Sequence, residues 1–280
     1  MNIIASNKET TRIMNKYQLD TKKSIGQNFL IDHHIIEKII KKAELSKESC
    51  VIEVGPGIGA LTQYLSLKAG KVIAYDIDLR LKPVLEETLS DYDNIEIIFQ
   101  DFLTVDLKEI TKKLLKDYKE VVIVANLPYY ITTSILEKII MSQDLVDRII
   151  VMMQKEVALK LVKPIKTKEK LPLHIIMSLI GNLDYLFTVP KQVFIPNPKV
   201  ESAIIRFKLE NKELIDISWL YDFINICFKQ RRKTLMNNLK NYYKDLDIKN
   251  ILNELKIDLS IRSEALSFNQ WLLLYNYFNI

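Results

Sequence analysis

The stretch that decides the fold is CVIEVGPGIGALT at residues 50–62. An apolar, strand-like run leads into a loop with three of the six glycines of the chain, Gly55, Gly57 and Gly59, and a helical pattern follows. Glycine permits positive φ angles and lets a ligand approach the backbone closely. A strand, a glycine-rich loop and a helix in this order are typical of a site for an adenosine-containing cofactor, although a plain tight turn is the alternative. The spacing fits neither the dinucleotide pattern G-x-G-x-x-G nor a P-loop.

Strand-like and helix-like segments alternate outward from this loop. Short apolar runs predict strands, and apolar residues at helical spacing predict the helices between them. The predicted strands lie at 50–55, 71–78, 94–101 and 148–154, with a strand followed by a turn at 121–130 and further strands at 174–190 and 202–210. This alternation predicts an α/β fold, with a parallel sheet that carries helices on both faces. Ligands of such folds bind at the carboxyl ends of the strands.

The length of 280 residues allows one large and one small domain. Beyond residue 210 the pattern is helical only, so we expect a lead-in at 1–23, an α/β domain at 24–210 and a small all-helical domain at 211–280. The net charge of +5 fits a polyanionic partner, but it is weak evidence alone.

The cysteines and the apolar runs predict where the protein works. Cys50 and Cys227 lie far apart and have no partners at metal-binding spacing. We therefore expect no metal centre and no disulfide framework, in a reducing cytoplasmic compartment. No apolar run has the length of a signal peptide core or of a membrane span, so we expect no membrane partner.

Two carboxylates follow the two strands after the glycine loop. Asp76 comes at nearly the sequence distance at which an acidic residue accepts hydrogen bonds from ribose hydroxyls. Asp101 follows the next strand and is placed to reach the adenine end of a cofactor. The two carboxylates favour a cofactor site over a bare turn.

The reaction centre is predicted at Asn126-Leu127-Pro128-Tyr129, after the strand VVIVA. Pro128 fixes its own φ and restricts Leu127, so the turn can aim the Asn126 side-chain oxygen and the Leu127 carbonyl at one exocyclic amine. Tyr129 offers a flat ring for a base that has left its stack. An amine held in this way can turn its lone pair toward an electrophilic methyl group. Such an in-line methyl transfer needs no nucleophilic side chain, because it depends mostly on how the reactants are positioned. Such turns are common after strands, so this interpretation depends on the cofactor loop.

These residues belong to a wider set of blocks in which the sequence resembles the small-subunit rRNA adenine dimethyltransferases. The blocks cover nearly the whole chain and are KKSIGQNFLID (22–32), VIEVGPGIGALT (51–62), NLPYYITTSIL (126–136), MQKEVALKLV (153–162), VFIPNPKVESAIIRF (193–207) and FKQRRKTLMNNL (228–239). The resemblance implies a Rossmann-like S-adenosylmethionine methyltransferase fold without a metal. It also implies dimethylation of the N6 amines of two adjacent adenines near the 3′ end of small-subunit rRNA, within the immature small ribosomal subunit. We expect a monomer.

The resemblance assigns roles to single residues. It implies that Asn28 and Leu30 contact S-adenosylmethionine together with Gly55, Asp76, Asp101 and Asn126. It also implies that Phe194 stacks near the target base, although a Phe beside two prolines could equally belong to the core.

The sequence departs from the family pattern at three places. Asp76 stands where the family usually has the longer Glu, and Tyr130 where it often has Asn. The run KEKLPLHIIM at 168–177 replaces a family block, so no function is carried over there.

A basic cluster within the predicted helical domain predicts an RNA-binding face. Lys229, Arg231, Arg232, Lys233 and Lys240 fall on a predicted helix or its lead-in. Such clusters suit phosphate contacts, but a solvated helix face is the alternative for any single charge run.

Other functions remain open from the sequence. A large-subunit rRNA methyltransferase that gives antibiotic resistance would share the fold and the turn, but the QKEVA-like and QRRKTL-like blocks argue against it. A ribosome-assembly factor without catalysis is a second alternative, which the intact glycine loop, Asp76, Asp101 and the NLPY turn argue against. The basic tail makes a small-molecule or DNA methyltransferase the weakest alternative.

Overall fold

The computed structural model describes residues 3–19, 27–142, 146–162, 172–210 and 216–279. Contacts divide the chain into two compact units, one of residues 1–158 and 184–208, the other of residues 159–183 and 209–280. The boundaries predicted after residues 23 and 210 fall within or beside 20–26 and 211–215, outside the described residues. The division differs from the sequence-based expectation in giving residues 159–183 to the second unit.

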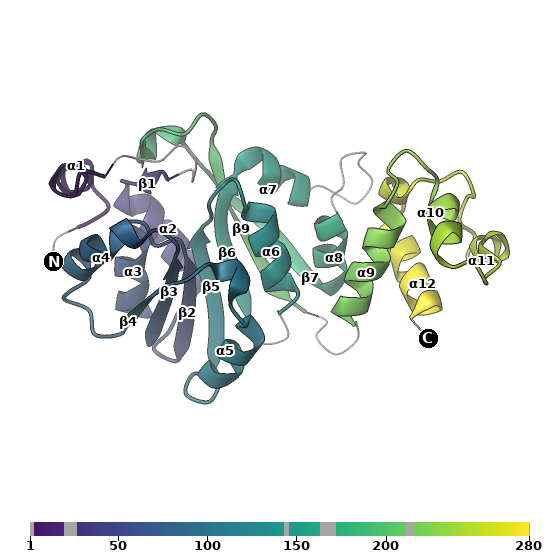
Figure 1. The fold of residues 1–280 in the computed structure, drawn as a ribbon, viewed down its shortest axis with the longest axis horizontal. Helices are drawn as coiled ribbons and strands as arrows, with labels where there is room; N and C mark the ends of the chain where they lie inside the picture. Colours follow the sequence, from purple (N-terminus) through teal and green to yellow (C-terminus); the bar gives the residue numbers. More distant parts are fainter. Residues whose placement is uncertain (1–2, 20–26, 143–145, 163–171, 211–215, 280) are drawn as a thin grey trace. The chain divides into compact units, whose positions relative to one another are not determined.

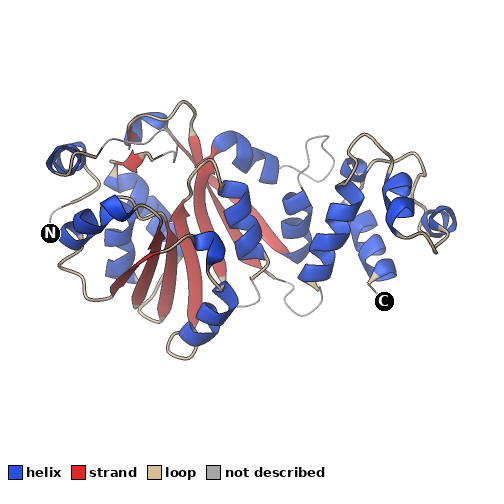
Figure 2. Cartoon of the chain, in the orientation of Figure 1, coloured by secondary structure: helices blue, strands red, loops and turns tan. Residues whose placement is uncertain are grey.

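The central sheet has seven strands among the described residues, in the order β4-β3-β2-β5-β6-β9-β7 (Figure 2). Their bounds are β2 (Ser49–Val54), β3 (Lys71–Asp76), β4 (Ile95–Phe99), β5 (Glu120–Asn126), β6 (Arg148–Gln154), β7 (Gly181–Val189) and β9 (Ser202–Leu209). Strands β2 to β6 are parallel, as predicted, whereas β9 runs antiparallel to β6. The order reverses between β2 and β5, which is the position where α/β sheets bind ligands.

Helices cover both faces of this sheet (Figure 1). The helices that pack over the core cluster of one face are α1 (Asn7–Lys16), α2 (His33–Ala43), α3 (Ala60–Lys68) and α4 (Lys82–Thr88). Figure 1 shows α5 (Leu107–Leu114) and α6 (Thr132–Ile140) on the opposite face. Alternate strand residues point to opposite faces of a sheet. Val122 and Val124 therefore belong to the core cluster under α1 to α4, whereas the equally buried Val121 and Ile123 point to the opposite face.

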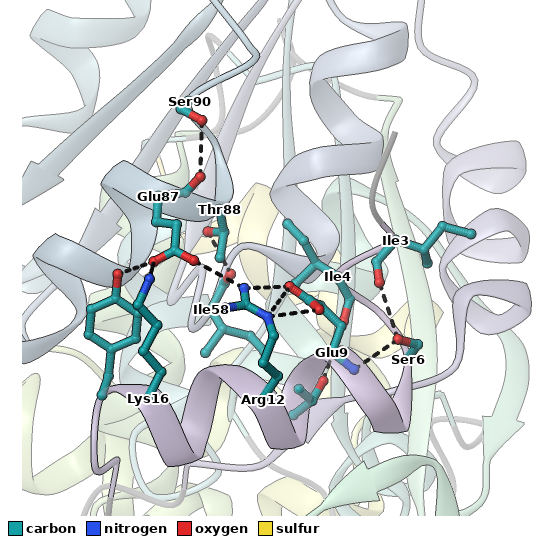
Figure 3. Close-up of polar contacts among 12 residues, drawn as sticks. Ile3, Ile4, Ser6, Glu9, Arg12, Lys16, Ile58, Glu87, Thr88 and Ser90 are labelled. Atoms are coloured by element: carbon teal, nitrogen blue, oxygen red, sulfur yellow. Dashed lines mark hydrogen bonds and ion pairs between the residues drawn. The ribbon is translucent and has the colours of Figure 1, made fainter.

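An ionic cluster holds α1 against α4 (Figure 3). Arg12 donates to Glu87 Oε1 at 3.0 Å, and Lys16 donates to the other carboxylate oxygen. The neighbouring Thr88 hydroxyl donates to the Ile58 carbonyl at 3.1 Å. Helix α4 therefore connects the N-terminal helix to the glycine loop.

The second unit is helical apart from the strand ends that it shares with the sheet. Its helices are α8 (Pro172–Ile180), α9 (Ile217–Phe228), α10 (Leu235–Tyr242), α11 (Ile248–Glu254) and α12 (Phe268–Phe278), and α7 (Lys155–Val162) spans the division. The strand predicted at 174–190 is wrong in its first half, because helix α8 continues to residue 180 and β7 begins after it. A short apolar run fits a buried helix as well as a buried strand, and α8 packs against α9 and α12.

Candidate active site

A pocket that is partly open to solvent lies at the carboxyl ends of β2, β3 and β5. It belongs wholly to the first unit. Four segments line it: residues 27–30 before α2; Glu53, residues 55–58 and residues 60–61 around the glycine loop; residues 76–78 at the end of β3; and residues 126–130 at the end of β5. The position is the one expected for a ligand site in an α/β sheet.

The glycine loop is built so that its backbone borders the pocket. Gly57 has a φ of +59° and Gly59 a φ of +90°, conformations that other residues rarely adopt. A Cβ atom on Gly57 would come within 3.3 Å of Phe29 Cδ1, and one on Gly59 within 3.0 Å of Leu89 Cδ2. A side chain at either position would have to displace the neighbour that closes the loop. The predicted residues Gly55 and Gly57 both line the pocket.

Asp76 ends β3 inside the pocket and is only 8% exposed. Burial raises the pKa of its carboxyl group to about 6, although backbone N–H groups lower the pKa in part. Its Oδ1 accepts a hydrogen bond from Asp78 N at 2.8 Å. A carboxylate in this place suits a ribose diol, as predicted from its distance to the loop.

Asp78 belongs to the pocket although the sequence did not single it out. Arg80 holds the pKa of the Asp78 carboxyl down at about 2, and Gln27 Nε2 donates to Asp78 Oδ2 at 2.9 Å. Gln27 comes from the N-terminal segment that lines the other side of the pocket. This hydrogen bond therefore joins that segment to the end of β3.

Asp101 lies outside the pocket lining. Its Oδ1 accepts from Leu103 N at 2.9 Å and so caps a short 3₁₀ turn. Burial, and then the charges of Asp101 and Asp76, raises the pKa of the Tyr130 hydroxyl. Tyr130 itself lines the pocket and is 50% exposed.

The turn after β5 is fixed by hydrogen bonds on both sides. Leu127 N donates to the Met152 carbonyl at 3.0 Å, and the Pro128 carbonyl accepts from the Thr132 hydroxyl at 2.9 Å. The Tyr129 hydroxyl is hydrogen-bonded to Ser202 on β9. The four predicted residues from 126 to 129 all line the pocket, so the cofactor loop and the turn share one site.

The N-terminal segment adds Asn28 and Leu30 to the lining, as predicted. Strand β1 (Phe29–Leu30) pairs with β8 (Phe194–Ile195), and Leu30 lies opposite Phe194. Phe194 is fully buried in the core cluster and does not line the pocket. Its ring has no exposed face on which a base could stack, so the structure supports the core alternative.

Glu53 is a pocket residue that was not predicted from the sequence. It lies in β2 two residues before Gly55, lines the pocket and is 1% exposed. Burial raises the pKa of its carboxyl group to about 8. The signal that could have found it is a charged residue inside a buried apolar strand, which is rare without a purpose.

The predicted RNA-binding residues belong to the second unit. Lys229, Arg231, Arg232 and Lys233 are exposed in the turn between α9 and α10, so they lie in a lead-in and not on a helix. The buried Asn238 holds this turn, because its side chain donates to the Cys227 carbonyl at 2.8 Å and accepts from Gln230 N. Sequence reasoning missed Asn238, which follows an exposed Asn of the same type.

The described residues contain no group of three or more His, Cys, Asp or Glu side chains arranged to hold a metal ion. Within the same residues, each helix is too short or too polar to cross a membrane.

Comparisons with known proteins agree over the length of the chain. A model of the family "Ribosomal RNA adenine dimethylase" matches residues 18–279. Relatives from Bacillus mycoides and Bacillus anthracis, both named "Ribosomal RNA small subunit methyltransferase A", are 42% identical over 99% of this chain and 97% of their own length.

Two solved structures are similar as well. A dimethyladenosine transferase from Plasmodium falciparum has a TM-score of 0.74 at 27% identity, covering 90% of this chain and 97% of that one. The 23S rRNA methyltransferase ErmE has a TM-score of 0.67 at 26% identity, covering 90% and 100%. With a family model that spans nearly every residue, this chain belongs to the ribosomal RNA adenine dimethylases.

Proposed function

We propose that this chain transfers methyl groups from S-adenosylmethionine to the exocyclic N6 amines of two adjacent adenines near the 3′ end of small-subunit rRNA. One observation carries the proposal: a single pocket joins the glycine loop, the buried carboxylate of Asp76 and the turn from Asn126 to Tyr129. A donor site and a base site that meet in one pocket allow in-line transfer by positioning.

The residues present fit S-adenosylmethionine, which supplies an electrophilic methyl group on a cationic sulfur. The buried Glu53 Oε2 has no hydrogen-bond partner among the described residues, and a cationic ligand would supply one. Gly57 borders the pocket without a side chain, where a Cβ atom would crowd Phe29 of the same lining, and Asp76 is placed for the ribose hydroxyls. Asn28 and Leu30 would close the pocket from the N-terminal side, and Asp101 would act at its adenine end. No metal enters this proposal.

The chain's own residues would hold the target amine. The Asn126 side-chain oxygen and the Leu127 carbonyl would accept the two N–H groups, which turns the nitrogen lone pair toward the methyl group. Tyr129 would support the flipped base with a ring whose hydroxyl is fixed on Ser202. Each adenine would lose one proton for each methyl group that it gains.

The RNA partner would be bound by the exposed basic turn of the second unit. Lys229, Arg231, Arg232 and Lys233 offer four side-chain cations for phosphate contacts. We infer that the substrate is small-subunit rRNA within the immature subunit, and that the enzyme acts in the cytoplasm as a monomer.

A large-subunit activity is the second candidate, favoured by the similarity to ErmE. The higher identity to the Bacillus relatives named as small-subunit enzymes makes it the weaker candidate. A non-catalytic assembly factor would not need the pocket that joins the glycine loop to the turn.

The test is methyl transfer from labelled S-adenosylmethionine to unmethylated small subunits, with large subunits in parallel and Asn126→Ala as the control. We expect dimethyladenine in the small subunit and its loss in the variant. Label only in the large subunit would move the protein to the second candidate. Tight binding of the small subunit without transfer would favour the assembly factor.

A further inference from the structure

The end of helix α4 has contacts with the glycine loop and with the N-terminal helix. The Thr88 hydroxyl donates to the Ile58 carbonyl at 3.1 Å. The preceding residue, Glu87, accepts from Arg12 at 3.0 Å and from Lys16, both on α1 (Figure 3). Neither Thr88 nor Glu87 lines the pocket, but Ile58 does. The end of α4 therefore links a residue of the pocket to a helix that does not reach it.

The Ile58 carbonyl lies where the glycine loop has most backbone freedom. Gly57 and Gly59 flank it with φ angles of +59° and +90°, and glycine adopts such angles about as readily as negative ones. The direction of the carbonyl between them is therefore not fixed by local sterics alone. The bond from Gly59 N to the Pro56 carbonyl, at 3.0 Å, stays within the loop, whereas the Thr88 hydroxyl comes from another helix.

The N-terminal segment is joined to the glycine loop by a second route. Gln63 lies in the first turn of α3, is 2% exposed, and donates its backbone N–H to the Gly59 carbonyl at 2.9 Å. Its side chain accepts from Ile4 N at 3.2 Å and donates to the Tyr92 hydroxyl at 3.0 Å. Ile4 itself is buried in the core cluster of this face. The segment that carries α1 is thus attached to both helices that hold the loop.

We propose that Thr88 is a positioning residue for the donor site, and that helix α1 supports it through Glu87. This inference rests on the proposed function. The Thr88 hydroxyl holds the Ile58 carbonyl, and with it the loop backbone, in the arrangement that accepts S-adenosylmethionine. A loop that is already in place loses less conformational freedom when the ligand binds, so the affinity is higher. The donor and its product, S-adenosylhomocysteine, differ by one methyl group and its charge, so the affinity of both should depend on Thr88.

The experiment is calorimetric titration of the full-length protein with S-adenosylhomocysteine, for the wild type and for Thr88→Val. Valine keeps the branched shape of threonine and removes the hydroxyl. The net contribution of one hydrogen bond corresponds to roughly a 2- to 10-fold change in an equilibrium constant, so we expect the dissociation constant to rise by about that factor. Thr88→Ser keeps the hydroxyl and should restore the wild-type affinity.

Thr111→Val is the matched control, because the Thr111 hydroxyl also donates to a backbone carbonyl, that of Leu107 at 2.7 Å, but within its own helix α5. Both valine variants should lose stability, and only Thr88→Val should weaken product binding. Turnover separates positioning from a general loss of structure. With unmethylated small subunits, Thr88→Val should raise the KM for the donor and leave kcat and the KM for the subunit unchanged.

The part played by α1 is tested by reversing a charge. Glu87→Lys would place a third cation against Arg12 and Lys16, so we expect α1 to be held less firmly and the dissociation constant to rise within the range given for Thr88→Val. Adding Lys16→Glu restores a pair of opposite charges and should recover part of the affinity. In the Thr88→Val background, Glu87→Lys should add little, because the contact through which α1 acts is already lost. The exposed Glu86→Lys controls for net charge and should leave the affinity unchanged.

Three results would overturn the inference alone: an unchanged dissociation constant in Thr88→Val, a loss of affinity in Thr88→Ser as large as in Thr88→Val, or an undiminished effect of Glu87→Lys in the Thr88→Val background. If Thr88→Val does not fold, Glu87→Lys and its recovery by Lys16→Glu still decide, because these side chains lie at the surface. A wild type that binds neither donor nor product would instead refute the proposed function itself.

Discussion

Replacing Gly59 with alanine tests how the glycine loop is held. Gly59 has a φ of +90°, and a left-handed backbone costs an L residue roughly 1–2 kcal/mol. The new Cβ atom would lie 3.0 to 3.2 Å from three carbon atoms of Leu89, and such overpacking costs about 1–3 kcal/mol. We therefore expect Gly59→Ala to lower the free energy of unfolding by roughly 2–5 kcal/mol.

A second substitution separates the two causes. Leu89 is 5% exposed, so Leu89→Ala alone should cost about 2–5 kcal/mol through the cavity that it leaves. In the double variant the close approach is gone and only the backbone strain of residue 59 remains. The double variant should therefore be more stable than the sum of the single effects predicts, by about 1–3 kcal/mol.

The assay is urea unfolding followed by far-UV circular dichroism at 25 °C. Gly57→Ala is the comparison, because its φ of +59° is similarly left-handed but its nearest contact, Phe29 Cδ1, is more distant at 3.3 Å. Strictly additive effects in the double variant, or a Gly59→Ala protein as stable as Gly57→Ala, would refute the argument from Leu89.

Three further predictions concern charge and hydrogen bonding. Asp76→Asn should weaken donor binding about 10- to 100-fold, because it removes a charged acceptor. It should nevertheless stabilise the free protein at pH 7 by up to ~3 kcal/mol, because the pKa of Asp76 is raised to about 6 and its ionised form opposes folding above that pH. Below about pH 4 this stabilisation should be absent, as thermal unfolding measured against pH would show. Glu87→Gln should cost ~0.5–1 kcal/mol at pH 7. Lys16, Tyr17 and Arg12 hold the pKa of Glu87 at about 2, so its contribution is present above about pH 4.5 and wild type and variant should converge in stability as the pH falls toward 2. Asn238→Ala should cost about 1–3 kcal/mol, because it removes the hydrogen bonds to the Cys227 carbonyl, which keeps the Ser263 hydroxyl as a donor, and from Gln230 N. It should also weaken rRNA binding in a filter assay, whereas the exposed Asn237→Ala should change stability by less than ~0.5 kcal/mol.

The parts of the fold that follow from local pattern were predictable. The alternation of apolar runs and helical segments predicted the parallel part of the sheet, because each period of the pattern reflects one kind of element. The direction of β9 was not predictable, since an antiparallel strand buried on both faces has the same apolar pattern as a parallel one. Helix α8 was mistaken for a strand because nearly all of its residues are buried, which removes the periodicity that marks a surface helix.

Local sequence pattern was also limited in predicting the residues of the site. The residues that end strands, such as Asp76 and Asn126, could be placed because the carboxyl ends of parallel strands meet at one edge. Phe194 could not, since its burial depends on the pairing of β8 with β1, two segments far apart in the sequence. The basic turn at 229–233 was placed next to a helix correctly, but the side chain that holds it, Asn238, is recognised only from its contacts.

The two buried carboxylates of the pocket stand at positions where the stability of the free protein alone would favour uncharged residues. Glu53 and Asp76 both have raised pKa values, about 8 and about 6, so the ionised form of each opposes folding at pH 8 and above. An apolar residue at position 53 and an amide at position 76 would each make the empty protein more stable. Both carboxylates border the same cavity, where a cationic, ribose-containing ligand would compensate them. The stability that the free chain gives up at β2 and β3 is therefore regained on donor binding, and binding should stabilise the wild type more than either Glu53→Gln or Asp76→Asn.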